Sequence, residues 1–149
     1  MKNILMACAL ASLVALGGCA SGGGTKSGVS KKGGPDVRAQ ARWDALLKKE
    51  TELAYDYLSP GARSTIAREQ YASDMRNRPV RWKKAQVESK ECASEDSCKV
   101  KVLLEYSAKL PMVAGGDVTS PAILEETWIA VDGVWYYVPA DLVQGKGLR

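Results

Sequence analysis

Residues 99–109 read KVKVLLEYSAK, an alternation of apolar and polar residues. Side chains of a β-strand point alternately to opposite faces of the sheet, so this period predicts a half-buried strand. One face carries Val100, Val102, Leu104, Tyr106 and Ala108, and the other carries Lys99, Lys101, Leu103, Glu105, Ser107 and Lys109.

Further strands are predicted on both sides of this segment. Residues 80–90 (VRWKKAQVESK) form a weaker strand pattern, and residues 127–138 (TWIAVDGVWYYV) indicate two strands around Asp132-Gly133. This dipeptide suits a type I′ turn, which requires positive φ at both central residues. Such a turn pairs Val131 with Val134, Ile129 with Tyr136, and Trp128 with Tyr137. Residues 111–121 (PMVAGGDVTSP) are expected to form a loop.

Cys92 and Cys98 flank a short polar segment between two of the predicted strands. In an oxidising compartment two such cysteines are expected to form a structural disulfide. A metal pair would lack further thiol or imidazole ligands, and a redox pair usually has a spacing of two residues. These two readings are the alternatives to the disulfide.

Helical spacing of apolar residues replaces the alternation before residue 80. Residues 36–50 predict an amphipathic helix with Asp36 as its N-cap, and residues 51–58 continue the pattern after a break. Pro60 ends that helix because it disfavours the helical conformation at Ser59, which can cap the next turn. Residues 64–76 predict a third helix.

The N-terminus predicts export. Lys2 is followed by an apolar run over residues 4–16 that is too short to cross a bilayer, so residues 1–18 are interpreted as a signal peptide. Leu16-Gly17-Gly18-Cys19 resembles the lipobox of bacterial lipoproteins, in which the cysteine is diacylated and becomes the mature N-terminus. Ala20 and Ser21 follow, and in a Gram-negative host the resemblance then implies the outer membrane, facing the periplasm.

The mature chain divides into three parts. Residues 19–35 comprise the lipidated cysteine and a flexible Gly/Ser/Lys tether with a reach of roughly 20 Å. Residues 36–142 are expected to form a single domain, and residues 143–149 a C-terminal tail. Acyl chains on Cys19 would anchor the protein to a membrane without spanning it.

Composition excludes several function classes. The chain has 149 residues, 26% of them charged, and contains no His and no Phe. Without histidine there is no His-assisted nucleophile, no His-ligated zinc or haem and no imidazole acid or base. The formal net charge of +4 is a mild excess, so nucleic-acid binding is not expected. We assign no cofactor and no metal site.

Helices followed by hairpins predict an α+β domain, with N-terminal helices packed on a curved antiparallel sheet. The order of residues 42–47 (RWDALL), 54–60 (AYDYLSP) and 125–136 (EETWIAVDGVWY) resembles that of the nuclear transport factor two superfamily. The resemblance covers about residues 37–142 and implies a cone-shaped, cystatin-like fold.

That superfamily contains ketosteroid isomerase, small dehydratases and many non-enzymatic domains. In its enzymes, the cone holds a carboxylate base and tyrosine or carboxylic-acid donors. The carboxylates that could serve as the base are Asp56, Asp74, Glu105 and Glu126. The tyrosines that could donate are Tyr55, Tyr57, Tyr71, Tyr106 and Tyr136. Their spacing does not single out one pair.

We therefore expect a non-enzymatic envelope lipoprotein that binds a small hydrophobic ligand or a protein partner. With phenylalanine absent, Trp and Tyr must fill the core, and they could also line a ligand cone. The residues assigned to that ligand site are Tyr57, Tyr106, Trp128 and Tyr136. The alternatives are a ketosteroid-isomerase-like or dehydratase-like enzyme, and a structural or assembly subunit of the envelope.

Overall fold

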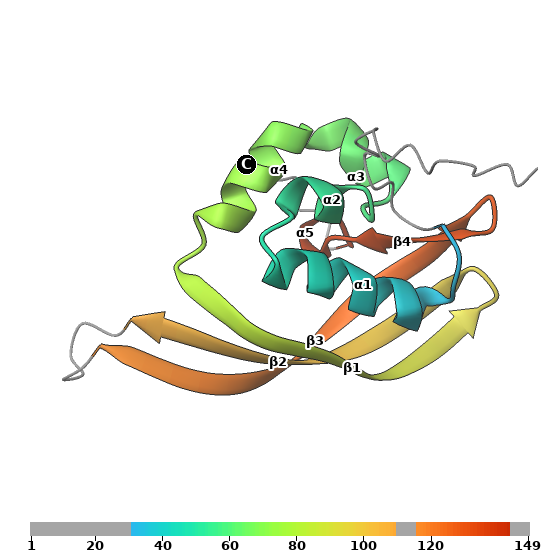
Figure 1. The fold of residues 1–149 in the computed structure, drawn as a ribbon. Helices are drawn as coiled ribbons and strands as arrows, with labels where there is room; N and C mark the ends of the chain where they lie inside the picture. The colour runs from blue at the N-terminus through green and yellow to red at the C-terminus, as the bar shows by residue number, and fades with distance from the viewer. Residues whose placement is uncertain (1–30, 110–115, 144–149) are drawn as a thin grey trace, which may run out of the picture.

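The computed structural model describes residues 31–109 and 116–143. Helices α1 (Pro35–Leu47), α2 (Thr51–Tyr55), α3 (Pro60–Thr65) and α4 (Arg68–Arg76) come first. Strands β1 (Val80–Ser94), β2 (Ser97–Lys109), β3 (Asp117–Val131) and β4 (Val134–Val138) follow, and α5 (Ala140–Val143) comes last. Figure 1 shows α1 to α4 gathered on one face of a curved sheet.

The four strands pair in chain order as an antiparallel meander. The alternation predicted for residues 99–109 is confirmed for its first part, since Val100, Val102 and Leu104 of β2 are buried in the core beneath the helices. It is wrong near the end of the strand, where Ser107 is buried and Tyr106 and Ala108 are only partly buried. The turn between β3 and β4 is also confirmed. Asp132 and Gly133 have φ values of 52° and 73°, as a type I′ turn requires.

Strand β3 is longer than predicted. It begins at Asp117 and includes Pro121, so the loop expected over residues 111–121 is wrong for its second half. The remaining loop positions up to residue 115 lie outside the described residues. Strand β4 pairs only with residues 127–131 of β3, so the edge of β3 near Pro121 is open, where proline is tolerated.

The helices differ from the prediction in number and in their first cap. Pro35 takes the first helical position of α1, and Asp36 lies in the first turn instead of capping it. The predicted cap at Ser59 is confirmed, because its hydroxyl accepts from the Ala62 amide at 3.2 Å. The helix predicted over residues 64–76 is divided at Ile66, whose backbone is extended.

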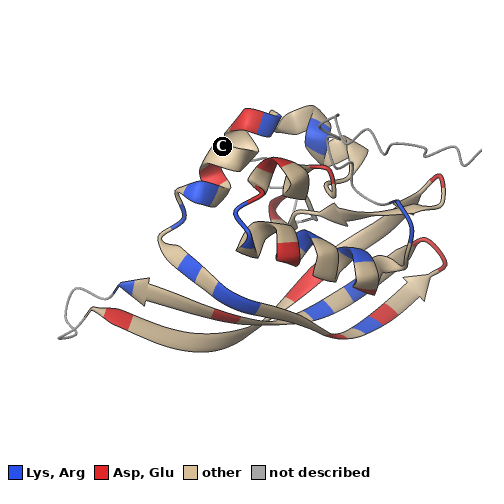
Figure 2. Ribbon diagram, viewed as in Figure 1, with Lys and Arg blue, Asp and Glu red and all other residues tan. Residues whose placement is uncertain are grey.

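The open edge of β1 is occupied by a side chain of α1. The Gln40 amide donates to the Ala85 carbonyl at 3.1 Å and accepts from the Val87 amide at 2.9 Å, as a neighbouring strand would. Lysine and arginine also recur along β1 (Figure 2). Both features protect an edge strand against pairing with another chain.

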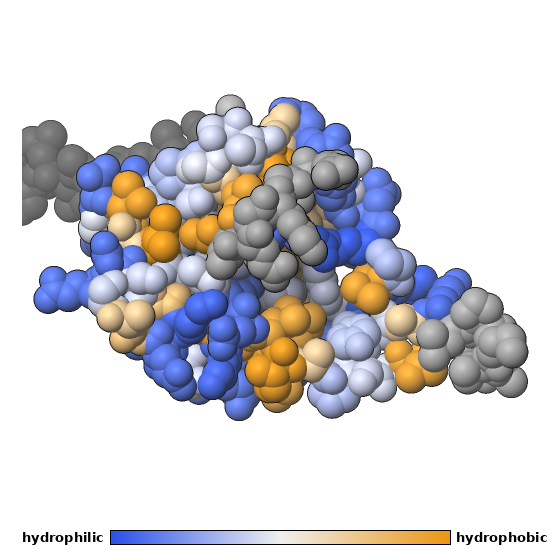
Figure 3. Space-filling model, turned by 180° about the vertical axis from the view of Figure 1, so that it is seen from behind, coloured by the Kyte–Doolittle hydropathy of each residue, from blue (hydrophilic) through white to orange (hydrophobic). Residues whose placement is uncertain are grey.

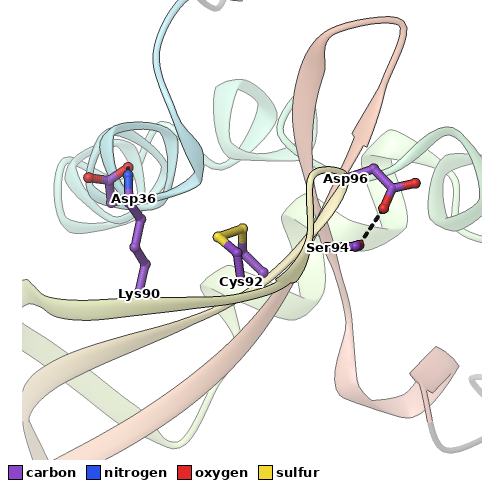
Figure 4. The surroundings of a disulfide bond; sticks show 6 residues. Asp36, Lys90, Cys92, Ser94 and Asp96 are labelled. Carbon is purple, nitrogen blue, oxygen red and sulfur yellow. Dashed lines mark hydrogen bonds and ion pairs between the residues drawn. A yellow bond between two sulfur atoms is a disulfide. The ribbon is translucent and has the colours of Figure 1, made fainter.

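A disulfide closes the end of the β1–β2 hairpin. Cys92 and Cys98 are directly opposite in the strand register, and their sulfurs are bonded with a Cα–Cα distance of 3.9 Å. Figure 4 shows the bridge close to Lys90, whose ammonium group contacts the Asp36 carboxylate of α1 at 2.8 Å. This region therefore ties the hairpin to the start of the first helix.

The cone-shaped, nuclear transport factor two-like fold that the sequence suggested is wrong. The sheet is a simple four-stranded meander, and four short helices, instead of three, precede it. The resemblance rested on core aromatics and on the Ser-Pro break. Trp43, Tyr57 and Trp128 are indeed buried, but large aromatics fill the interface of any helix layer packed on a sheet, so they do not specify this superfamily.

Candidate functional site

A buried ion pair joins the helical layer to the sheet. Arg42 lies on the face of α1 that meets the sheet, and Glu126 lies on the inward face of β3. Their side chains are 2.8 Å apart, and each is only 5% exposed. Burying two charges costs free energy unless they are paired and hydrogen-bonded, so the surroundings of this pair determine its role.

Two indole groups complete the coordination of the carboxylate. Trp43 donates to Oε1 of Glu126, which also accepts from Arg42, and Trp128 donates to Oε2. Both indole nitrogens are 2.9 Å from the oxygen that they contact. Each oxygen of Glu126 is therefore already bonded to an N–H group of the protein.

The guanidinium group of Arg42 is less completely satisfied. One terminal nitrogen donates to the Tyr71 hydroxyl at 3.4 Å, and the group lies 4.0 Å from the ring centroid of Tyr137. Its Nε is buried and has no hydrogen-bond partner among the described residues. Burial acts against its charge, but Tyr71, Glu126 and Tyr137 favour the charge and raise the pKa of Arg42 above its ordinary value.

The backbone holds Tyr137 in place from both sides. On one side it pairs with Trp128 of β3. On the other, its amide donates to the carbonyl of Tyr57 and its carbonyl accepts from the amide of Ser59, both at 2.8 Å. Burial raises the pKa of Tyr137, so its hydroxyl is protonated at neutral pH and can donate a hydrogen bond.

Arg42, Tyr71, Glu126 and Tyr137 contact one another and line a cavity of about 940 Å³ between the helices and the sheet; we call this group the polar end of the cavity. Its apolar walls come from α1, α4 and the first three strands, and include Trp43, Leu46, Met75, Trp82, Leu104 and Leu124. Its charged lining also includes Asp74, Arg78 and Asp141. The space-filling view from behind shows several separate apolar patches on this face (Figure 3).

The four residues assigned to a ligand site from the sequence do not form one site. Tyr106 lines the cavity, while Trp128 lies in the core, where it holds Glu126. Tyr57 and Tyr136 belong to a separate cluster around Arg38, whose guanidinium is 4.9 and 5.5 Å from their ring centroids. Cys19, the expected lipidation site, lies outside the described residues.

Of the four carboxylates considered as a base, only Glu126 is buried in the cavity. Asp56 pairs with Arg68, Asp74 accepts from Gln70, and Glu105 is exposed on β2. Nitrogen donors hold both oxygens of Glu126, and none of the described tyrosine hydroxyls donates to it. The geometry is that of a structural carboxylate and does not match a proton-abstracting pair.

Sequence reasoning missed Arg42. The arginine precedes Trp43 and follows Arg38 by four residues, so both arginines fall next to the apolar stripe of the predicted helix. Charged side chains beside such a stripe are usually solvated. Arg42 is buried because it pairs with Glu126, which is 84 residues away in the sequence. The strand that carries Glu126 was predicted to begin only at residue 127, so the pair could not be foreseen.

Comparison with known proteins concerns the fold alone. No protein-family model matches the chain, and no curated protein is significantly similar to it. A SEC-C motif containing protein from Rhodopseudomonas palustris matches with a TM-score of 0.52 at 13% identity, covering 68% of this chain and 72% of that one. In fold, the chain is similar to this protein.

Two other solved structures match less well. A SEC-C motif containing protein from Psychrobacter arcticus has a TM-score of 0.49 at 14% identity, covering 68% of this chain and 56% of that one. A protein from Catenulispora acidiphila has a TM-score of 0.44 at 13% identity, covering 68% and 83%. The names of these proteins state no enzymatic activity.

The family suggested by the sequence, a bacterial lipoprotein with a nuclear transport factor two-like domain, is therefore wrong, since the structural similarity is to a SEC-C motif containing protein. The acylation of Cys19 as such is not addressed by this similarity and stays a prediction. Within residues 31–109 and 116–143, no helix is long and apolar enough to cross a membrane. The same residues hold no group of three potential metal ligands.

Proposed function

We propose that this protein is a membrane-anchored binding module of the cell envelope that holds a small hydrophobic molecule in the cavity between its helices and its sheet. The observation that supports this proposal is the cavity itself. It has the size of a small-molecule site, it is lined largely by apolar and aromatic side chains, and its lining includes the contacting polar group of Arg42, Tyr71, Glu126 and Tyr137.

A binding role fits the site better than catalysis. An isomerase-like reaction requires a carboxylate that can take a proton beside a hydroxyl donor. Glu126 is instead held by Arg42 and two indoles, and using it as a base would break the ion pair that keeps Arg42 satisfied. The proposal is therefore a non-enzymatic one.

The anchor in this proposal is diacylated Cys19, followed by the tether. Acylation supplies stable membrane attachment because each buried methylene contributes about 0.8 kcal/mol. Labelled palmitate should enter the wild-type protein and be lost in Cys19→Ala, which should also leave the membrane fraction. Equal labelling of both proteins would contradict the anchor without affecting the cavity.

The cavity is tested with two neighbouring residues on opposite faces of β3. Ala122 lines the cavity, whereas Ile123 is 58% exposed on the outer face. The exported domain from Ala20 onward would be examined by native mass spectrometry and by titration with a hydrophobic fluorescent dye. Wild type and Ile123→Trp should retain or bind a ligand, and Ala122→Trp, whose folding is checked by its thermal transition, should not.

Equal binding by Ala122→Trp and wild type would overturn this location of the site. An empty wild-type domain that also fails to bind the dye would overturn ligand binding altogether. The protein-partner reading would then be favoured, and cross-linking in intact cells would be the way to find the partner.

A further inference from the structure

The polar end of the cavity has hydrogen-bond donors that the protein leaves unused. The Tyr137 hydroxyl makes no hydrogen bond to any residue that the structure describes. The Tyr71 hydroxyl accepts from Arg42, but its own O–H has no acceptor there. The buried Nε of Arg42 is a third donor without a partner within the described part of the chain.

Acceptors at this end are already occupied. Both oxygens of Glu126 receive N–H groups from Arg42, Trp43 and Trp128. Of the three donors, the Arg42 Nε is the one that is both buried and without a partner among the described residues, and such an unmet donor costs free energy that a bound acceptor removes. A ligand group that fits this end of the cavity therefore accepts hydrogen bonds and donates none.

Charge distinguishes among such acceptors. Arg42 and Glu126 neutralise each other. Of the other charged residues that line the cavity, Arg78 is the only described cation, against Asp74, Glu125 and Asp141, so the lining has a net negative charge. A carboxylate ligand would add a negative charge beside Glu126, in a lining where the single charge of Arg78 does not offset the acidic residues. An ammonium ligand would meet the unused N–H of Arg42. Both ions are therefore disfavoured relative to an uncharged acceptor.

We propose that the cavity binds an uncharged amphipathic molecule whose carbonyl group lies at the Arg42, Tyr71 and Tyr137 end and whose hydrocarbon chain lies along the apolar walls. An acyl ester or a long-chain ketone has this chemistry. This inference rests on the proposed function, because it names the class of ligand for the same cavity.

The test compares four probes of equal chain length: methyl laurate, laurate, dodecylammonium and dodecane. Each would displace a hydrophobic dye from the exported domain. Methyl laurate should bind at least about tenfold tighter than dodecane, because its carbonyl accepts hydrogen bonds that dodecane cannot. It should also bind tighter than laurate, because it brings no negative charge to the cavity. Tyr137→Phe keeps the ring over Arg42 and should reduce the preference for the ester over dodecane severalfold.

Tyr136→Phe is the matched control, since Tyr136 belongs to the Arg38 cluster and is not among the described residues that line the cavity. It should leave the preference unchanged. Tighter binding of laurate, or an ester preference that survives both Tyr71→Phe and Tyr137→Phe, would overturn the inference while leaving the proposed function intact. Failure of all four probes to bind would overturn both.

Discussion

Two arginines one turn apart on α1 occupy different environments. Arg38 and Arg42 are 2% and 5% exposed, and both face the interior. Arg42 contacts a carboxylate and lies at the end of a cavity. Arg38 lies between the rings of Tyr57 and Tyr136, and its Nε donates to the carbonyl of Trp135.

The pKa values of the two guanidinium groups move in opposite directions. Burial lowers the pKa of Arg38, and Tyr57 and Tyr136 offset only part of that effect. For Arg42 the carboxylate and hydroxyl oxygens outweigh burial and raise the pKa. The two arginines therefore differ in role although they lie one turn apart on the same helix. Arg38 is held in a structural cluster and Arg42 lines a cavity, because different residues surround each guanidinium group.

The largest expected effect comes from removing the partner of Arg42. Glu126→Leu leaves a buried cation and two indole N–H groups without an acceptor, and should destabilise the domain by roughly 3–5 kcal/mol in urea unfolding. Arg42→Met combined with Glu126→Leu should recover much of this loss, because it removes the uncompensated charge. A single Glu126→Leu variant as stable as wild type would contradict the buried ion pair.

Removing Arg38 should cost less. Arg38→Met keeps most of the side-chain volume but deprives the Trp135 carbonyl of its donor, with an expected loss of roughly 1–3 kcal/mol. Arg63, which lies 5.5 Å from the ring centroid of Tyr136, provides the control, and Arg63→Met should cost less than about 1 kcal/mol. Ligand binding should be unchanged in Arg38→Met. If Arg38→Met lost ligand binding, Arg38 and Arg42 would not have the separate roles described above.

Gln40, between the two arginines in sequence, contacts the sheet edge instead of its face. Gln40→Ala should cost about 1 kcal/mol and speed hydrogen exchange of the Val87 amide, which then loses its acceptor. Gln40→Glu keeps an acceptor for that amide but loses the donor to Ala85, and should give an intermediate result. Unchanged exchange at Val87 in Gln40→Ala would show that the side chain does not occupy the edge.

The smallest effect is expected at the partly exposed ion pair between Asp36, in the first turn of α1, and Lys90. The hydrogen bond from Lys90 lowers the pKa of Asp36 from its ordinary value of 3.8, so the folded state binds this proton less readily than the unfolded state. The resulting stabilisation is present at neutral pH and is lost as the pH falls through the folded-state pKa. Asp36→Asn should therefore cost less than about 0.5 kcal/mol at neutral pH and nothing in strong acid, when measured by urea unfolding at several pH values. If Asp36→Asn still lowered the free energy of unfolding in strong acid, the loss would not come from the Asp36–Lys90 ion pair.

The local parts of this structure could be predicted from the sequence, and the site could not. The alternation around Val100, the Asp132-Gly133 turn and the Ser59 cap depend on neighbouring residues, and all three are confirmed. The start of β3 was missed because Pro121 and the preceding glycines resemble a loop, although an open strand edge accommodates the proline.

The polar end of the cavity depends on contacts between distant segments. Glu126 was considered as a base and Tyr71 as a donor, but Arg42, which brings them together, was treated only as part of a helix pattern. Tyr57 and Tyr136 were grouped with Tyr106 because all are aromatic, but the first two contact Arg38 and Tyr106 lines the cavity. The family resemblance was wrong for a related reason. It depended on aromatic residues of the core, and these indicate which residues are buried but not how the strands and helices are connected.

The most direct test of this account follows the Nε–H resonances of Arg38 and Arg42 by nuclear magnetic resonance, assigned with the Arg38→Met variant, while methyl laurate is added. The account predicts that the Arg42 resonance shifts on saturation and that its exchange with water slows, because the bound carbonyl supplies an acceptor to Nε or reorders the hydroxyls beside it. The Arg38 resonance should stay in place. A saturated protein in which Arg42 is unchanged, or in which Arg38 alone shifts, would contradict the assignment of the cavity and its polar end as the binding site.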